Sequence, residues 1–369
     1  MHAIESYNNV VQWTDITLRA RKPFRPGQAL RRFDAICLER QGGMGDLLMA
    51  LGAAKVVKAL SDRPVIVATA PQFRSLVEAC PHVDHVVDKV EMLGEQYGNV
   101  KHVDLAPAAY GLSRVHQIDA YLQAFGVSAE AKMKSIDLVT NRAAEEEVDR
   151  LLSAWPNPAL DGARIILHCG TGDPNRSWPR ERWSELASKL IELGHQVIEI
   201  GANSDRETQR AGTTPEGLLS AVNALSTLGT VALMRRSDIL VAADSGPVQL
   251  AAASDVGIVA LFSVVNGSCR LPFRHGIAEW MAVEVKPTCG FYPCYQQMHR
   301  AEVMAPFLEK IRNQTLAVPQ LFAQWCPDGG SFACMREQIS VQMVMDAIGR
   351  LDSSIVAAER SSSFDASVM

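Results

Sequence analysis

Residues 33–60 read FDAICLERQGGMGDLLMALGAAKVVKAL, which is a short apolar run, a glycine-rich loop and a longer apolar segment. Residues 35–38 have the length and composition of a buried strand, whereas residues 47–60 repeat apolar side chains at helical spacing. The loop between them contains Gly43 and Gly45. This succession of strand, loop and helix predicts a parallel sheet covered by helices.

The same succession continues along both halves of the chain. WPNPALDGAR, residues 155–164, separates the halves with two prolines and a glycine that break regular structure. In the first half we expect strands at 65–68 and 85–87 and helices at 72–79 and 141–153. In the second half we expect strands at 165–168, 196–201, 239–242 and 257–262, helices at 180–193 and 230–236, and a helix ending at 253.

Length supports two domains, because 369 residues exceed one ordinary hydrophobic core. The expected division is an N-terminal arm at 1–32, a first α/β domain at 33–158, a second at 159–352 and a flexible tail at 353–369. The arm is polar and contains several arginines, so a solvated extension is the simpler interpretation.

Composition excludes several classes of protein. Hydrophobic residues make up 47% and charged residues 21%, as in ordinary globular proteins. The net charge of −5 disfavours nucleic acid as a partner, although it leaves a local basic patch open. The apolar runs are shorter than the roughly 20 residues that cross a bilayer, and the N-terminus does not resemble a secretory signal. We therefore expect a cytoplasmic protein whose eight cysteines are reduced thiols or metal ligands.

The first motif that could carry chemistry is QGGMGD, residues 41–46. Glycines after a strand let a ligand approach the backbone, and Asp46 lies at the start of the next helix. The motif lacks the dinucleotide-binding spacing and the Gly-Lys-Ser/Thr ending of a phosphate-binding loop. A helix cap is the alternative interpretation of Asp46.

The second motif is HCGTGDPNRSWPRERWSEL, residues 168–186. A strand ends in a loop that contains Thr171 and Arg176, and a helix then starts through Pro179. A helix N-terminus beside a guanidinium suits a pyrophosphate. The alternative is a surface ion pair for Arg176, with Trp178 and Trp183 as packing residues.

The third motif is ADSGPVQLAAA, residues 243–253, which follows a buried strand. It offers a carboxylate, a hydroxyl and free amides at the end of a strand, where open α/β sheets bind ligands. The alternative is that Asp244 only caps a helix, and residues 251–253 suit close packing of a helix on the sheet.

Together these three motifs resemble the signature elements of the lipopolysaccharide heptosyltransferase family, which includes relatives that heptosylate autotransporter proteins. The resemblance runs from about residue 34 to 348. It implies the GT-B fold, in which two Rossmann-like domains face a cleft, with an acceptor domain followed by a nucleotide-sugar donor domain. It also implies an inverting transfer, with ADP-heptose as the favoured donor, and no catalytic metal.

The resemblance implies roles for individual residues. Asp46 matches the proposed general base, and Arg176 matches the basic residue, usually Lys, that neutralises the departing diphosphate. Gln249 stands where many members have His, which replaces a charge-assisted contact by a neutral one. The residues expected to bind the donor are Gly43, Gly45, Thr171, Arg176, Asp244, Ser245, Gly246, Pro247 and Gln249.

Four cysteines lie near the end of the second domain, namely Cys289, Cys294, Cys326 and Cys334. Their gaps are wider than usual zinc-knuckle spacing. Some members of the resembled family have a similar set that binds one structural metal, which implies zinc or iron here, pinning an inserted segment around residues 304–315. Four unrelated buried thiols are the alternative.

The sequence thus predicts an inverting glycosyltransferase that moves a sugar, with heptose favoured, to a hydroxyl acceptor. The acceptor stays open among a glycan, a protein, a small molecule and a modified nucleobase, and the oligomeric state is not readable. The basic arm leaves peripheral contact with the inner membrane open. Two other functions remain: a non-catalytic nucleotide-sugar-binding or assembly subunit, and an epimerase or hydrolase of the same fold, which product analysis with donor alone would reveal.

Overall fold

The fold is given by a computed structural model, which describes residues 29–109, 115–155, 162–171, 173–202, 214–275, 281–297 and 326–351. The chain divides into two compact units. The first unit comprises residues 1–139, 264–274 and 293–327, and the second comprises residues 140–263, 275–292 and 328–369. Most of the predicted arm, the predicted insertion at 304–315 and the predicted tail lie outside the described residues.

The described part of the first unit forms a parallel sheet of four strands in the order β3-β2-β1-β4. Ile36 and Leu38 of β1 point to one face and pack with the two helices α2 and α5. The opposite face packs against a short 3-10 segment, η2. The elements are β1 (Ala35–Glu39), α2 (Met44–Ser61), β2 (Val65–Ala68), η1 (Pro71–Phe73), α3 (Arg74–Glu78), β3 (His85–Val87), η2 (Val90–Gln96), β4 (Val100–Asp104), α4 (Ala106–Ala109), α5 (Gln117–Ala124) and η3 (Ala131–Met133).

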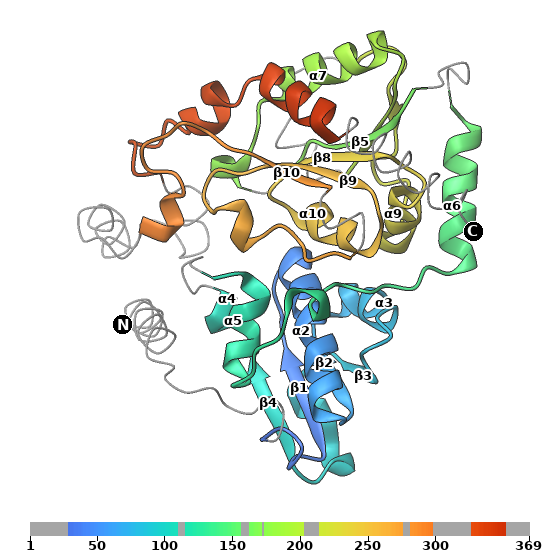
Figure 1. The fold of residues 1–369 in the computed structure, drawn as a ribbon. Helices are drawn as coiled ribbons and strands as arrows, with labels where there is room; N and C mark the ends of the chain where they lie inside the picture. Colours follow the sequence, from blue (N-terminus) through green and yellow to red (C-terminus); the bar gives the residue numbers. More distant parts are fainter. Residues whose placement is uncertain are drawn as a thin grey trace, which may run out of the picture. The chain divides into compact units, whose positions relative to one another are not determined.

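The described part of the second unit forms a parallel sheet of six strands in the order β10-β9-β8-β5-β6-β7. Figure 1 shows α7 on one side of this sheet and α9 and α10 on the other. The elements are α6 (Arg142–Ser153), β5 (Arg164–His168), η4 (Pro174–Arg176), α7 (Arg180–Glu192), β6 (Gln196–Ile200), β7 (Leu219–Ser220), α9 (Thr227–Met234), β8 (Ile239–Ala243), α10 (Gly246–Leu250), η5 (Ala251–Ala253), β9 (Gly257–Leu261), β10 (Ala282–Val285) and η9 (Cys334–Gln338), and residues 341–351 are also helical.

Two tryptophans anchor the core beneath α7. Trp178 and Trp183 are fully buried and meet edge to face with ring centroids 4.8 Å apart. The indole Nε1 of Trp178 donates to the carbonyl of Ile339 at 2.9 Å, which ties the chain after η9 to the sheet. The interpretation of both tryptophans as packing residues is confirmed.

Strand order fixes where loops from different strands converge. In the second unit the chain leaves β5 toward β6 on one side, whereas β8 pairs with β5 on the other, so the order reverses between β5 and β8. In the first unit the same reversal lies between β1 and β4. Open parallel sheets bind ligands outside the carboxyl ends of the strands at such reversals. The glycine-rich loop follows β1, and the second and third motifs follow β5 and β8.

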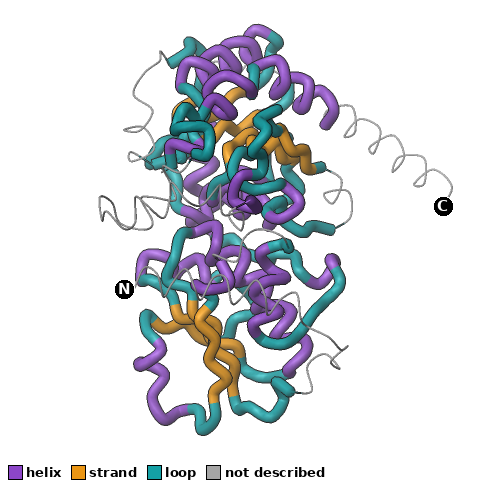
Figure 2. The backbone as a smooth tube through the Cα atoms, turned by 90° about the vertical axis from the view of Figure 1, so that its left-hand side faces the viewer, coloured by secondary structure: helices purple, strands orange, loops and turns teal. Residues whose placement is uncertain are grey.

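Helix α6 belongs to the second unit, so the units divide after residue 139 rather than at the predicted 158/159. Three acidic residues of α6 pair with groups at the ends of α9. Arg236 contacts Glu145 and Asp149 at 2.8 and 2.6 Å, and Glu147 accepts from the Ser226 amide at 2.7 Å. These contacts join α6 to the two ends of α9, and Figure 1 shows the two helices side by side. In Figure 2 the strands of each unit (orange) lie among helices (purple).

Several elements differ from the sequence expectations. α2 begins at Met44 rather than 47, and α10 ends at Leu250 before a 3-10 turn rather than continuing to 253. β4 and β10 were not predicted: both are edge strands that are mostly only partly buried, and β4 has two adjacent polar residues, Lys101 and His102, while β10 has only four residues. Within the described residues, no helix is both long and apolar enough to span a bilayer.

Candidate active site

The loop after β5 is closed by its own hydroxyls. Thr171 Oγ1 and Ser177 Oγ each lie 3.0 Å from the carbonyl oxygen of Asp173, and they lie 2.8 Å from each other. The turn η4 follows Asp173 and contains Pro174, whose ring fixes its own φ. This internal bonding holds the backbone from which Arg176 projects.

The Arg176 guanidinium joins two loops of the second sheet. Its Nη2 forms an ion pair with the carboxylate of Asp173, and its Nη1 donates to the main-chain carbonyl of Asp244 at 2.7 Å. The same Nη1 lies 3.8 Å from Asp244 Oδ2. Arg176 therefore does form an ion pair, but it also bridges the loops that follow β5 and β8, at the reversal of strand order. A partly exposed guanidinium fixed there can hold a diphosphate.

The turn after β8 places polar groups at the same edge of the sheet. Ser245, rather than Asp244, is the N-cap of α10, and no side chain caps that helix. Asp244 is buried and its amide donates to the carbonyl of Leu261 at 3.0 Å, so its backbone continues the sheet. The alternative interpretation of Asp244 as a cap is therefore not what the structure shows.

Ser245 also fixes the tautomer of a histidine that the sequence analysis left without a role. Its Oγ donates to the carbonyl of Ala243 at 2.9 Å, and it lies 3.2 Å from Nδ1 of His168. A hydroxyl that has given its one hydrogen to a carbonyl can only accept from the ring. Nδ1 of His168 therefore carries the hydrogen.

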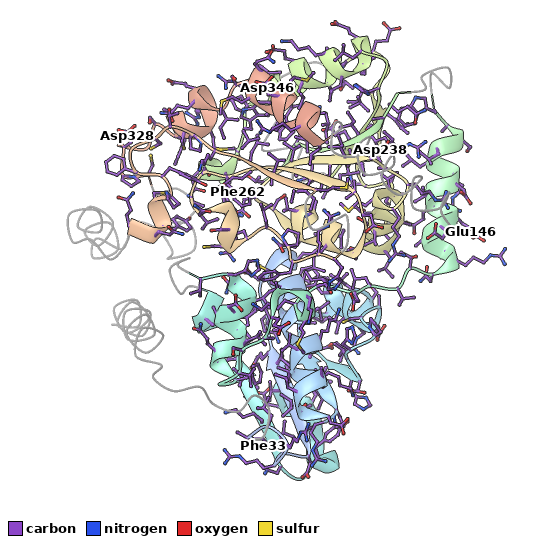
Figure 3. The ribbon with its side chains drawn as sticks, in the orientation of Figure 1. Phe33, Glu146, Asp238, Phe262, Asp328 and Asp346 are labelled. Carbon is purple, nitrogen blue, oxygen red and sulfur yellow. The ribbon has the colours of Figure 1, made fainter. Side chains whose placement is uncertain are left out.

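Gly246 and Pro247 start α10, and Gln249 lies buried one residue before its end. Figure 3 labels Asp238, directly before β8, and Phe262, directly after β9. Asp238 marks the amino ends of the parallel strands and Phe262 marks the edge formed by their carboxyl ends. The predicted donor-binding residues of the second unit belong to the edge marked by Phe262. Ser263 follows and donates to the carbonyl of Asn175 at 2.6 Å, which joins the loop after β9 to η4.

In the first unit, Asp46 lies in the first turn of α2, whose N-cap is Gly43 without a side-chain cap bond. Its carboxylate forms an ion pair with Arg40, the residue that directly follows β1. Burial alone would lower the pKa of Arg40, but the charge of Asp46 and the adjacent Tyr121 raise it overall. Asp46 is therefore not a helix cap, and its side chain keeps 30% of its surface exposed.

Two glycines of the loop serve different purposes. A Cβ on Gly42 would overlap the guanidinium of Arg40, so that position needs glycine for the ion pair to form. A Cβ on Gly43 would meet nothing within 4 Å, and Gly43 is exposed, so the protein leaves that backbone open to a ligand. Gly45 follows in the first turn of α2.

The pKa of Tyr121 is raised, mainly because the side chain is buried and to a lesser extent because of the negative charge of Asp46. A second arginine, Arg270, lies with Nη1 3.9 Å from Asp46 Oδ1. Sequence reasoning missed Arg40, Arg270 and His168. Arg40 could have been noticed because it directly precedes the QGGMGD motif, and His168 because it is the first residue of the second motif. No motif contains or adjoins Arg270.

The four predicted metal ligands divide between the units. Cys289 and Cys334 belong to the second unit, and Cys294 and Cys326 to the first. All eight cysteines are free thiols. Among the described residues, no group of three or more His, Cys, Asp and Glu side chains is arranged to hold a metal ion. The structural zinc or iron stays a prediction, which metal analysis of the purified chain tests, and no chemical step below depends on it.

Comparison with known sequences supports the resemblance predicted from the motifs. Residues 108–275 match the profile of glycosyltransferase family 9 (heptosyltransferase). Lipopolysaccharide heptosyltransferase 1 of Pseudomonas aeruginosa is 36% identical over 105 residues, which cover 28% of this chain and 29% of that protein. The chain thus aligns with less than a third of that relative's length.

Solved structures share the fold at low sequence identity. A family 9 glycosyltransferase from Veillonella parvula superposes with a TM-score of 0.59 and 16% identity, covering 86% of this chain and 97% of that one. The iron-containing dodecameric glycosyltransferase TibC of enterotoxigenic E. coli gives 0.60 and 16%, covering 88% and 80%. A further structure of TibC holds ADP-D-β-D-heptose. The predicted fold class, α/β with two Rossmann-like domains, is confirmed, as is the resemblance to the heptosyltransferases.

Proposed function

We propose that this chain, a relative of the family 9 glycosyltransferases, transfers a sugar from a nucleotide-sugar donor to a hydroxyl acceptor with inversion at the anomeric carbon. Heptose is the favoured sugar and ADP-heptose the favoured donor. The second unit would bind the donor and the first unit the acceptor.

The observation that carries the proposal is the bridge made by Arg176. A guanidinium that reaches from the loop after β5 to the carbonyl of Asp244 stands where an open α/β sheet binds its ligand. It can pair with the oxygens of a diphosphate and stabilise the negative charge that grows on them as the sugar leaves. The compact hydroxyl network of Thr171 and Ser177 would hold it there without reorganisation during the reaction.

Asp46 supplies the complementary chemistry. Its Oδ2 is engaged by Arg40, while Oδ1 lies 3.9 Å from the nearest guanidinium nitrogen of Arg270 and so is not hydrogen-bonded to it. The oxygen Oδ1 of this partly exposed carboxylate can accept the proton of an acceptor hydroxyl.

The proposed reaction is a single displacement. The acceptor oxygen attacks the anomeric carbon from the face opposite the diphosphate, its proton passes to Asp46, and the bond from the anomeric carbon to the phosphate oxygen breaks. The electron pair of that bond remains on the nucleoside diphosphate, whose added charge Arg176 neutralises. The products are the glycoside and the nucleoside diphosphate, and no metal or redox partner is required.

The donor assignment rests on the relatives rather than on a base-recognition contact. The names of the related proteins point to heptose, and TibC is described in complex with ADP-D-β-D-heptose. Gln249 offers an amide in place of an imidazolium, so the contact it makes with a phosphate or sugar hydroxyl would be a neutral one. We therefore expect the choice among ADP, UDP and GDP sugars to be decided by binding measurements.

Calorimetric titration of ADP-heptose, followed by UDP and GDP sugars, tests the donor site. We expect one of these donors to bind saturably, and both Arg176→Ala and Asp244→Ala to weaken binding at least tenfold, since each loses contacts with charged groups. Arg142→Ala is the matched control, because that arginine is almost fully exposed on α6 and forms an ion pair with Glu146, one turn along the same helix. It should bind the donor like the unmodified protein.

The outcomes separate the alternatives. Failure of every nucleotide sugar to bind would refute the glycosyltransferase. Tight binding without product from any hydroxyl acceptor would favour the nucleotide-sugar-binding or assembly subunit. Conversion of the donor in the absence of an acceptor would instead favour an epimerase or hydrolase.

A further inference from the structure

The segment at residues 266–271 follows β9 along the chain but packs within the first unit. It begins with Asn266, whose side chain accepts from the Ser268 amide at 2.9 Å and caps the short turn η6 (Gly267–Cys269). The amide of Leu271 donates back to the carbonyl of Gly267 at 2.6 Å. This compact turn carries Arg270 at its end.

Two residues at the start of α5, the N-cap His116 and Gln117, hold this segment. Nε2 of His116 lies 2.9 Å from the carbonyl of Leu271, and its Nδ1 accepts from the Ile118 amide at 3.2 Å. Since Nδ1 accepts, Nε2 carries the hydrogen and donates. The neutral imidazole therefore uses both of its nitrogens in hydrogen bonds. The centroid of its ring lies 4.2 Å from the centroid of the Phe273 ring.

Gln117 orients the side chain of Arg270. It is buried, and its Nε2 donates to the carbonyl of Ala108 at 3.1 Å. With the amide nitrogen fixed in this way, Oε1 accepts from Arg270 Nη1 at 2.7 Å. The same Nη1 lies 3.9 Å from Oδ1 of Asp46.

The two oxygens of Asp46 therefore meet two different arginines. Arg40, which is buried, pairs with Oδ2, and Arg270 faces Oδ1 without a direct hydrogen bond. A carboxylate held through one oxygen can still turn about its own axis. A second cation beside the other oxygen opposes that rotation and leaves room for a hydrogen-bond donor at Oδ1.

We propose that Arg270, oriented by Gln117, is a positioning residue that fixes the carboxylate plane of Asp46 and makes Oδ1 the oxygen that receives the acceptor proton. The inference rests on the proposed function, in which Asp46 is the base. Proton transfer needs the two heavy atoms within hydrogen-bond reach, and small misplacements of a catalytic group cost large factors in rate.

The test compares the full-length protein with Gln117→Leu, Gln117→Glu and Arg270→Met, and with Arg142→Met as control. Gln117→Leu keeps Arg270 but removes its anchor, so we expect kcat to fall by about ten- to a hundredfold with KM for the donor within about twofold. Gln117→Glu retains an oxygen that accepts from Arg270, and it should restore most of kcat. A purely structural role would give equal losses for both substitutions.

Crystal structures of the same variants give a readout that does not need activity. In Arg270→Met we expect the Asp46 carboxylate to occupy more than one orientation, whereas in the unmodified protein and in Arg142→Met it should occupy one. An unchanged carboxylate in Arg270→Met, or an unchanged kcat in Gln117→Leu, would overturn the positioning role. If the unmodified protein transfers no sugar at all, the proposed function fails on that result, and the crystal structures alone decide whether Arg270 positions Asp46.

Discussion

His116 should make the stability of the first unit depend on pH between about 4 and 6.5. Burial lowers its pKa from 6.5 to about 4, and the bond to the Leu271 carbonyl offsets only part of that effect. In the unfolded chain the imidazole returns to its ordinary value. Between these values the unfolded chain holds a proton that the folded chain does not, so stability rises with pH across this window and falls on acidification.

The size of the effect follows from the two pKa values. A difference of one pKa unit corresponds to about 1.4 kcal/mol, so acidification from above 6.5 to below 4 should remove about 3 kcal/mol of the free energy of unfolding. Above pH 6.5 both states are neutral at this position, and His116 adds no further dependence. Protonation would also place a hydrogen on Nδ1, where the Ile118 amide already donates.

The assay is urea unfolding followed by circular dichroism at a series of pH values from 4 to 8, for the unmodified protein and for His116→Asn. Asparagine can still cap α5 but does not titrate. We expect a constant loss of stability in the variant at neutral pH and a difference that shrinks as the pH falls. If the two proteins lose stability in parallel from pH 6.5 to 4, His116 is not held neutral by burial, and the reasoning fails.

Three further predictions concern the site and the packing beneath it. Asp46→Asn should lower kcat by about two to four orders of magnitude while leaving the calorimetric affinity for the donor unchanged, and a weaker affinity would contradict a role confined to the base. Asp173→Asn removes the carboxylate paired with Arg176, so donor affinity should rise by about two- to fivefold at low salt; weaker binding would mean that Asp173 serves mainly to orient the guanidinium. Gly52→Ala should destabilise the protein by about 1–3 kcal/mol in thermal unfolding, because the new Cβ would lie 2.8 Å from the carbonyl oxygen of Lys134. Gly349→Ala is the control and should not destabilise the protein, because it lies in a helix where a Cβ meets nothing within 4 Å.

The sequence predicted the parts of the fold whose signals are local. β8 is apolar along its whole length and β5 is apolar at its three central residues, as strands covered on both faces must be, and both could be located to within one residue. β4 carries Lys101 and His102 on a partly exposed edge of the sheet, so its sequence resembles a polar loop. The boundary between the units was misplaced because the charges of α6 gave no indication that their partners would be at the ends of α9.

The candidate site, too, could be predicted only where the signal is local in the sequence. Arg176 and Asp244 could be found because Asp244 directly follows β8 and Arg176 lies in the loop after β5. A parallel sheet brings the carboxyl ends of adjacent strands together whatever the loops contain. Even there, the sequence did not indicate that the guanidinium would bond to the backbone of Asp244 rather than to its carboxylate alone.

Arg270 had no such signal. It lies 153 residues from Gln117, in a segment with no motif, and its place beside Asp46 depends on α5 and on the turn at 267–269 folding together. A side chain that acts by holding another side chain need not adjoin a strand end or a glycine-rich loop, since its position is set by packing in three dimensions. The residues that we propose to touch the substrate can therefore be recognised from strand-end motifs. Residues that orient them become visible only when the contacts around each catalytic carboxylate and each guanidinium are followed outward.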